Sequence, residues 1–213
     1  MSDLGTRPLV VTDCDEVLLH MVAHFRDYLG AEHGVDFHWQ GGHFADAMRW
    51  RETGEPLEEA EMWRLLNLFF DTEMHRQTPI EGAVGAIRKL GEIADVVVLT
   101  NLMDHRLQLR AAQLAAHGIH ARVYTNQGPK GPALKAIIAE FRPSRTVFID
   151  DIAQHHASAA QDVPETIRLH LCGEPLLAPH IECAHLAGHA HARIDRWAEA
   201  LPWLLERLQE EDG

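Results

Sequence analysis

Short apolar runs, rich in β-branched residues, recur along this chain with helix-type segments between them. The runs span residues 8–12, 95–100, 121–125, 146–150 and 166–171. The first, second and fourth are almost continuously apolar, as is typical of strands that are covered on both faces. Strands that alternate with helices favour a parallel sheet with a layer of helices on each side. The pattern therefore predicts an α/β fold built on a doubly wound parallel sheet.

The segments between these runs carry apolar residues at helical spacing. The predicted helices span 81–90, 104–117, 132–141 and 193–208, and Pro202 lies inside the last of them. The alternation breaks at 19–78, where we expect helices at 18–29, 41–51 and 57–73 and no strand. A helical insertion directly after the first strand is the simplest interpretation of this stretch.

The composition limits the partners that this chain can have. Its 213 residues, 46% of them hydrophobic, suffice for one large domain with a modest insertion. A net charge of −13 repels nucleic acid and anionic membranes, so we expect neither as a partner. No apolar run approaches the length of a transmembrane helix. The first residues lack the pattern of a secretory signal and the three cysteines are too scattered for a disulfide framework, so we expect a cytoplasmic protein. We expect it to be a monomer or a homodimer.

The first apolar run leads directly into two carboxylates, Asp13 and Asp15. Alternate side chains of a strand point to the same face, so both carboxylates would point the same way if the extended backbone persisted. Two like charges about 4 Å apart repel by roughly 4 kcal/mol at an effective dielectric constant of about 20. Such a pair indicates a bound cation, a shared proton or solvent, and an acidic turn after a strand is the structural alternative.

Other strand ends and one loop also carry groups suited to binding ions. Thr100 and Asn101 follow the second run and can donate hydrogen bonds to an anion, and Lys130 lies in a glycine-rich loop before a helix. Asp150 and Asp151 follow the fourth run, and buried carboxylates need a metal or another partner. In a parallel sheet these groups gather at the carboxyl edge. A site so rich in carboxylates suits a bound phosphate only when Mg²⁺ is present.

The order of these motifs resembles the haloacid dehalogenase-like (HAD) superfamily over essentially the whole chain. DCDEV is similar to the first motif of the family, LTN to the second, Lys130 to the third and FIDD to the fourth. The resemblance implies a Rossmann-like catalytic core formed by residues 1–18 and 79–213. It further implies that residues 19–78 form an α-helical cap domain, inserted after the first motif.

The resemblance also assigns roles to the residues of these motifs. It implies that Asp13 is the nucleophile and that Asp15 is the general acid and base. Thr100 and Lys130 would hold the phosphoryl group. The implied ligands of Mg²⁺ are Asp13, the backbone carbonyl of Asp15 and Asp151, with Asp150 in support.

Two positions depart from the family pattern. Glu16 stands where the family often has glycine, and it alters the turn into the cap or adds a charge near the substrate. His155 stands where the family often has an orienting amide or carboxylate. We expect Asn101, Glu16 and His20 to contact the substrate. Further candidates from the cap are His24, Arg26, Trp39, Arg49, Trp50 and Arg51.

The predicted reaction is Mg²⁺-dependent hydrolysis of a small phosphorylated metabolite through an aspartyl phosphate on Asp13. A 2-haloacid dehalogenase also uses an aspartate nucleophile, but that chemistry needs no metal and usually lacks the second aspartate. Phosphonate cleavage usually needs a cap lysine, and residues 19–78 contain none. A non-catalytic protein that binds a phospho-ligand or a metal on the same scaffold is the remaining alternative.

A histidine-rich segment at 180–191 is a separate candidate for metal binding. Its potential ligands are Cys183, His185, His189 and His191. The spacing matches no strong ligand pattern, and a loop with exposed histidines explains the segment equally well.

Overall fold

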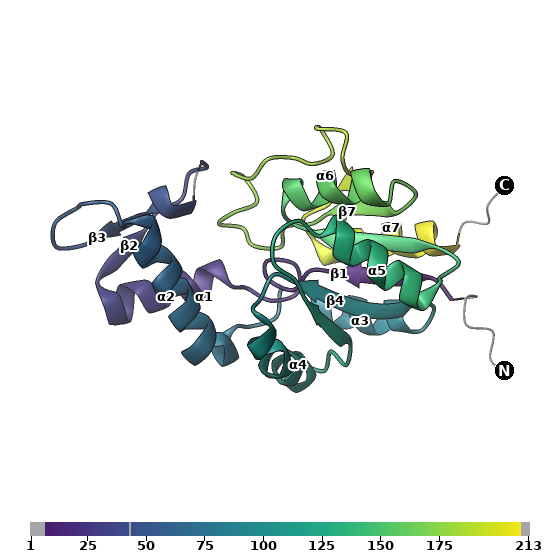
Figure 1. Cartoon of the computed structure of the whole chain (residues 1–213), viewed down its shortest axis with the longest axis horizontal. Coiled ribbons are helices and arrows are strands. Elements are labelled where there is room, and N and C mark those ends of the chain that lie inside the picture. Colours follow the sequence, from purple (N-terminus) through teal and green to yellow (C-terminus); the bar gives the residue numbers. More distant parts are fainter. Residues whose placement is uncertain (1–6, 43, 210–213) are drawn as a thin grey trace.

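The computed structural model describes residues 7–42 and 44–209 (Figure 1). Residues 1–6, on which most of the expectation about a secretory signal rests, lie outside the described residues. The chain forms a large lobe around one sheet and a small lobe beside it. We define the small lobe as residues 22–76; it follows the first strand in sequence and lies beyond the carboxyl end of that strand (Figure 1).

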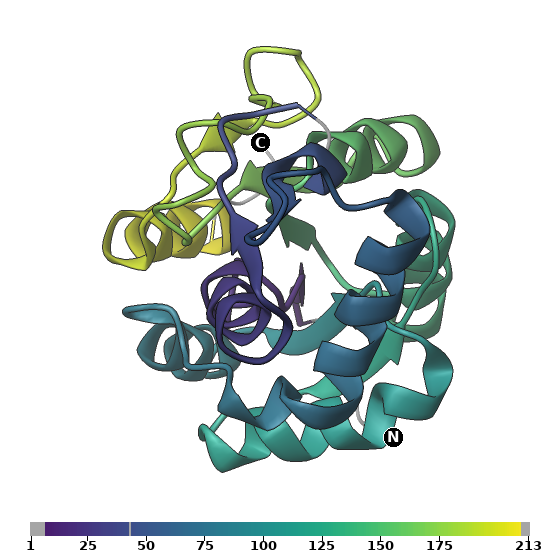
Figure 2. The same ribbon diagram turned by 90° about the vertical axis from the view of Figure 1, so that its left-hand side faces the viewer.

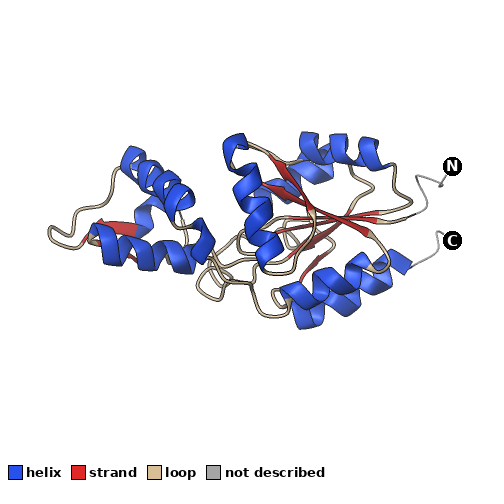
Figure 3. Cartoon of the chain, turned by 90° about the horizontal axis from the view of Figure 1, so that it is seen from below, coloured by secondary structure: helices blue, strands red, loops and turns tan. Residues whose placement is uncertain are grey.

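A six-stranded sheet in the order β5-β4-β1-β6-β7-β8 forms the centre of the large lobe. All its strand pairs are parallel (Figure 3). Its strands are β1 (Leu9–Thr12), β4 (Asp95–Thr100), β5 (Arg122–Thr125), β6 (Thr146–Asp150), β7 (Ile167–His170) and β8 (Ala192–Arg193). The predicted α/β fold with a parallel sheet is therefore confirmed.

Helices cover both faces of this sheet. They are α3 (Ala83–Gly91), α4 (Leu107–Ala116), α5 (Gly131–Phe141), α6 (Ala153–Asp162) and α7 (Trp197–Gln209). Alternate side chains of β1 enter different cores: Val10 packs with apolar residues of α3 and α7, whereas Leu9 and Val11 pack with those of α5 and α6. This alternation explains why the interior positions of the central strands are apolar on both faces of the sheet.

The small lobe packs around a second hydrophobic cluster, centred on buried residues such as Phe25, Leu65 and Phe69, which also includes Leu102, Cys172 and Leu177 of the large lobe. It contains α1 (Val22–Tyr28), a π-helical turn (Leu29–His33), β2 (Val35–Phe37), a 3₁₀ turn (Phe44–Ala47), β3 (Met48–Trp50), α2 (Glu59–Thr72) and a 3₁₀ turn (Met74–Arg76). Figure 2 shows α1 and α2 in front of the sheet when the molecule is viewed from this end.

Several sequence-based expectations about individual elements are wrong. Among the described residues of 41–51, only Phe44–Ala47 are helical, as a 3₁₀ turn, and 19–78 does contain strands, because β2 and β3 form an antiparallel hairpin. Each of those strands has three residues, which is too short for a pattern of alternation to be recognised. The last helix begins at Trp197 rather than at residue 193, and Pro202 lies within it. No helix among residues 7–42 and 44–209 is long and apolar enough to cross a membrane.

Candidate active site

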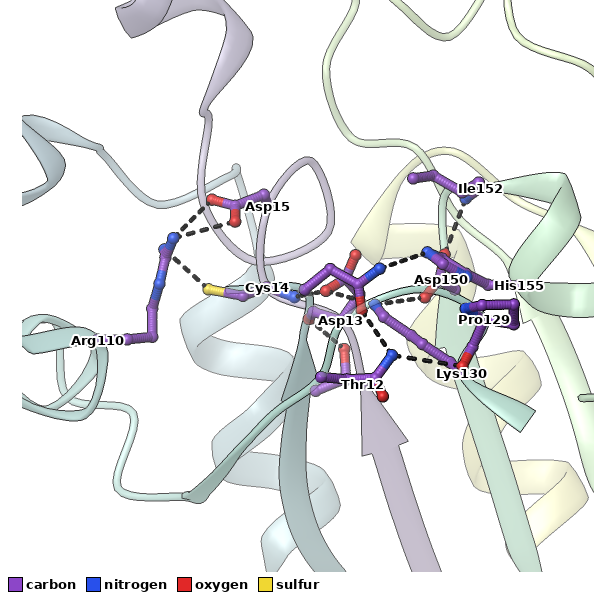
Figure 4. Close-up of polar contacts among 12 residues, drawn as sticks. Thr12, Asp13, Cys14, Asp15, Arg110, Pro129, Lys130, Asp150, Ile152 and His155 are labelled. Carbon is purple, nitrogen blue, oxygen red and sulfur yellow. Dashed lines mark hydrogen bonds and ion pairs between the residues drawn. The ribbon is translucent and has the colours of Figure 1, made fainter. Parts of the chain in front are cut away.

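The carboxyl edge of the sheet brings together the residues of three motifs. Asp13 directly follows β1, and its backbone N–H donates to the carbonyl of Ile149 in β6 (2.8 Å). Lys130 lies just before α5 and is fully buried. Its Nζ lies 2.7 Å from Oδ1 of Asp13 and 2.7 Å from Oδ2 of Asp150 (Figure 4). The parallel order β1-β6 thus places two acidic strand ends around one lysine.

Asp13, Asp150 and Asp151 form a cluster of buried carboxylates. One oxygen from each lies within 4.8 Å of the others. Burial raises the pKa of Asp13 to about 7, with a further contribution from Asp150, although Lys130 acts in the opposite direction. Burial also raises the pKa of Asp151 well above its usual range. Burial alone would raise the pKa of Asp150 as well, but Lys130, His155 and His156 together outweigh it and lower that pKa.

This cluster fits a hard divalent cation. Three buried carboxylates face the single positive charge of Lys130, so a dication is needed to balance them when all three are ionised. Carboxylate oxygens are the ligands that Mg²⁺ prefers in proteins. The three residues predicted as carboxylate ligands from the sequence therefore do lie together.

Thr100 is the last residue of β4 and Asn101 follows it, at the same edge of the sheet as this cluster, and the two residues differ in their partners. The hydroxyl of Thr100 is buried and has no hydrogen-bond partner, so it is available to donate to a bound anion. Asn101 donates to the carbonyl of Gly128 (3.0 Å) and accepts from Asn126 (2.9 Å). Its amide nitrogen also lies 3.4 Å from Nε2 of His155. The contacts of Asn101 thus hold the loop that carries Lys130.

Asp15 points away from Asp13, because the extended backbone ends at Thr12. Both of its carboxylate oxygens accept from Nη2 of Arg110 in α4 at 3.0 Å (Figure 4). The amide of Gln77 donates to Oδ1 of Asp15 at 2.7 Å. Arg110 is fully buried, and its Nη1 also lies 3.2 Å from the sulfur of Cys14.

Arg110 and Gln77 were not identified from the sequence. A signal for Arg110 exists, because it shares one face of its helix with Leu107 and Leu114 at spacings of three and four. An arginine on an apolar face predicts a buried acidic partner. Gln77 lies in the second linker between the lobes and has no comparable signal.

Glu16 has a left-handed backbone, with φ of 62°, which explains why glycine suits this position. Its Oε1 accepts from the backbone N–H groups of Met21 (3.0 Å) and Val22 (2.6 Å), at the start of α1. His20 lies nearby, with Nδ1 2.8 Å from Oε2 of Glu174. Glu16, His20 and Glu174 form a second cluster of potential ligands. Glu174 was missed although it, too, follows the carboxyl end of a predicted strand.

The remaining candidates take other roles. In the small lobe, Arg26 pairs with Asp27, Arg51 pairs with Asp36, and Arg49 donates to the carbonyl of Gly54. No three ligand groups converge within 180–191, all of which the structure describes. Two of its histidines bind backbone groups instead, His185 facing the carbonyl of Ala190 and His191 accepting from the N–H of Arg168.

No protein-family model matches the sequence, and no curated protein matches it. Solved structures do match. A HAD family hydrolase from Deinococcus radiodurans, with bound phosphate and sodium, is 20% identical with a TM-score of 0.65; the match covers 93% of this chain and 95% of that one.

Two further solved structures belong to the same superfamily. A HAD-superfamily hydrolase of subfamily IA from Geobacter sulfurreducens is 16% identical, with a TM-score of 0.55 and coverage of 95% of this chain and 99% of that one. A 2-haloacid dehalogenase from Pseudomonas syringae is 15% identical, with a TM-score of 0.56 and coverage of 94% and 99%. The chain therefore has the fold of the HAD-like hydrolases, as its motifs indicate.

Proposed function

We propose that this chain, which has the HAD-like fold, is a hydrolase that uses Mg²⁺ to cleave a small phosphate monoester through an aspartyl phosphate on Asp13. The observation that carries the proposal is the buried cluster of Asp13, Asp150 and Asp151 around Lys130. A dehalogenase of haloacids needs no metal, so it gives no reason to gather three carboxylates. The neighbour that holds phosphate and sodium supports the same choice of chemistry.

Asp13 is held in a fixed orientation for attack on phosphorus. Its Oδ1 accepts from the backbone N–H of Cys14 at 2.7 Å and lies 2.7 Å from Nζ of Lys130. The proposal assigns the attack to the other oxygen, Oδ2. When bound at the carboxylate cluster, Mg²⁺ would neutralise negative charge on the phosphoryl oxygens and on its ligands. Lys130 and the hydroxyl of Thr100 would stabilise the remaining charge that develops there.

Asp15 is proposed to move a proton in both halves of the reaction. As an acid it would protonate the leaving oxygen, and as a base it would activate the water that cleaves the aspartyl phosphate. Here its carboxylate is bound to Arg110 and Gln77, so it must turn away from them to act. Gln77 follows the small lobe directly, so a rotation of that lobe can carry the amide of Gln77 off Asp15. The small lobe is thus proposed to act as a cap whose movement frees Asp15 from Gln77, while the side chain of Asp15 itself turns away from Arg110, which lies in α4 of the large lobe.

The proposed substrate is a small phosphorylated metabolite, because the catalytic groups lie between two lobes of one chain. The cysteines at positions 14, 172 and 183 are free thiols, which fits the proposed location in a reducing cytoplasm.

The test is phosphate release from a panel of phosphorylated metabolites, with and without Mg²⁺. We expect metal-dependent release by the wild-type protein and none by Asp13→Asn, which keeps the shape of the side chain. Asp27→Asn, at an exposed pair with Arg26, is the matched control and keeps full activity. Full activity of Asp13→Asn would overturn the assignment. Halide release from 2-haloacids without metal would instead support a dehalogenase, and phosphate binding without any turnover a non-catalytic binder.

A further inference from the structure

We propose that Glu16, His20 and Glu174 form a second cation site, distinct from the cluster around Asp13, that binds a divalent transition-metal ion such as Zn²⁺. One carboxylate oxygen from each glutamate and one ring nitrogen of His20 lie within 4.8 Å of one another. The two clusters share no residue. The inference depends on this geometry alone and holds whether or not the proposed hydrolysis is correct.

Both glutamates are anchored through one oxygen and leave the other for a ligand. Oε1 of Glu16 accepts from the N–H groups of Met21 and Val22, and Oε1 of Glu174 accepts from the N–H of Leu176 at 2.9 Å. Oε2 of Glu16 is buried and has no hydrogen-bond partner. Oε2 of Glu174 faces His20. Hydrogen bonds that orient a ligand from behind are typical of metal sites.

When both glutamates are ionised, the charges of the cluster are not balanced without a cation. Glu16 and Glu174 are each only 3% exposed. A protonated His20 can neutralise Glu174, its partner at 2.8 Å, but leaves Glu16 without a counter-charge. A dication bound by both carboxylates and a neutral imidazole removes this imbalance.

The donor set favours a transition metal over Mg²⁺. Imidazole nitrogen together with carboxylate oxygen suits Zn²⁺ and its neighbours in the first transition series, whereas Mg²⁺ prefers oxygen ligands and retains its waters. The side chain of His20 is 24% exposed, which gives solvent access for the ion and for a water as a fourth ligand.

The position of the cluster assigns a structural consequence to the ion. Glu16 and His20 lie in the linker that leads from β1 into the small lobe, whereas Glu174 lies in the loop after β7 of the large lobe. A bound ion would cross-link this linker to the large lobe. It would therefore stabilise the chain against unfolding and restrict the start of α1.

The test measures Zn²⁺ binding to metal-free full-length protein by equilibrium dialysis, in millimolar Mg²⁺, with bound zinc quantified by elemental analysis. We expect one tightly bound equivalent in the wild-type protein. His20→Asn and Glu174→Gln should weaken its binding by more than about 100-fold, since even outer-shell changes at metal sites cost about 10–100-fold. Circular dichroism confirms that each variant is folded.

Two control variants separate this site from other ways of binding zinc. Asp151→Asn impairs the first cluster, and His189→Ala removes a histidine of the segment 180–191. Both should keep the tight equivalent, and Asp151→Asn should at the same time lose any Mg²⁺-dependent phosphate release. The proposal is overturned if the wild-type protein binds no tight equivalent, if His20→Asn and Glu174→Gln bind zinc as the wild type does, or if Asp151→Asn removes the equivalent.

Discussion

The ion pair between Arg110 and Asp15 allows the most specific test of this fold, because its partners lie 95 residues apart and no local sequence pattern brings them together. Arg110 is fully buried, the side chain of Asp15 is 17% exposed, and both carboxylate oxygens lie 3.0 Å from one guanidinium nitrogen. The guanidinium also lies over the ring of Phe70, with 5.9 Å from Cζ to the ring centroid. We therefore predict a measurable energetic coupling between positions 110 and 15.

The magnitude follows from burial. Removing one partner of a buried ion pair costs about 3–5 kcal/mol, because the other charge is left without compensation. Asp15 keeps some contact with water, so we expect the lower end, about 3 kcal/mol, for Arg110→Met. Asp15→Asn should cost a similar amount. The double variant should be more stable than the sum of the two losses predicts, with a coupling of about 2 kcal/mol.

The assay is urea unfolding of the four proteins of this double-mutant cycle, with EDTA present so that metal binding does not contribute. Arg106→Met provides the matched control, since Arg106 lies one helical turn earlier and pairs with Asp71 and Asn67 of the small lobe. Its coupling with Asp15→Asn should stay below about 0.5 kcal/mol. An equally small coupling for Arg110 would refute the pairing.

Three further predictions concern single side chains. Lys130→Met should abolish turnover and destabilise the fold by about 3–5 kcal/mol in urea unfolding without metal, because Asp13 and Asp150 lose their shared cation. Thr100→Val should lower kcat by about 10²–10³-fold without lowering stability, since the hydroxyl has no partner in the fold; reduced stability with unchanged kcat would contradict this. Burial lowers the pKa of His170 to about 4, below the 6.5 of an exposed histidine, so the unfolded state binds the extra proton between these values. The free energy of unfolding should therefore decrease as the pH is lowered through that window. Between pH 7 and pH 4, the wild-type protein should lose about 3 kcal/mol more of this free energy than His170→Asn does.

The strands β1, β4, β5, β6 and β7 and most of the candidate catalytic cluster were predictable from the sequence because their signals are local. The bounds of β4 and β6 match the apolar runs at 95–100 and 146–150. Once the sheet is parallel, the carboxyl ends of β1, β4 and β6 lie on the same edge. This rule places Asp13, Asp150 and Thr100 at one edge of the sheet, and the strand order β4-β1-β6 makes them neighbours.

The elements that were missed lack such signals. Helix α6 has no large apolar residue in its sequence AQHHASAAQD and buries His155, His156 and Ala159 instead. The strands β2, β3 and β8 have two or three residues each. A pattern of alternation cannot be recognised over so short a length.

The orientation of Asp15 was not predictable for a different reason. It depends on Arg110, which lies 95 residues away in the sequence. Strand geometry would place Asp13 and Asp15 on one face only if the extended backbone persisted, and the structure separates them into different environments. Asp13 faces Lys130 and the buried acidic cluster, whereas Asp15 is neutralised by Arg110.

The central claim is that Asp13 forms a covalent bond to phosphorus. The most direct test is a single-turnover reaction with Mg²⁺ and a phosphate monoester that the protein hydrolyses. The reaction is quenched in acid, and the peptides of the digested protein are examined by mass spectrometry. We predict a phosphoryl adduct on the side chain of Asp13, and a longer-lived adduct in Asp15→Asn, which lacks the base for its hydrolysis. Turnover that proceeds at full rate in Asp13→Asn, or an adduct on another residue, would contradict the account.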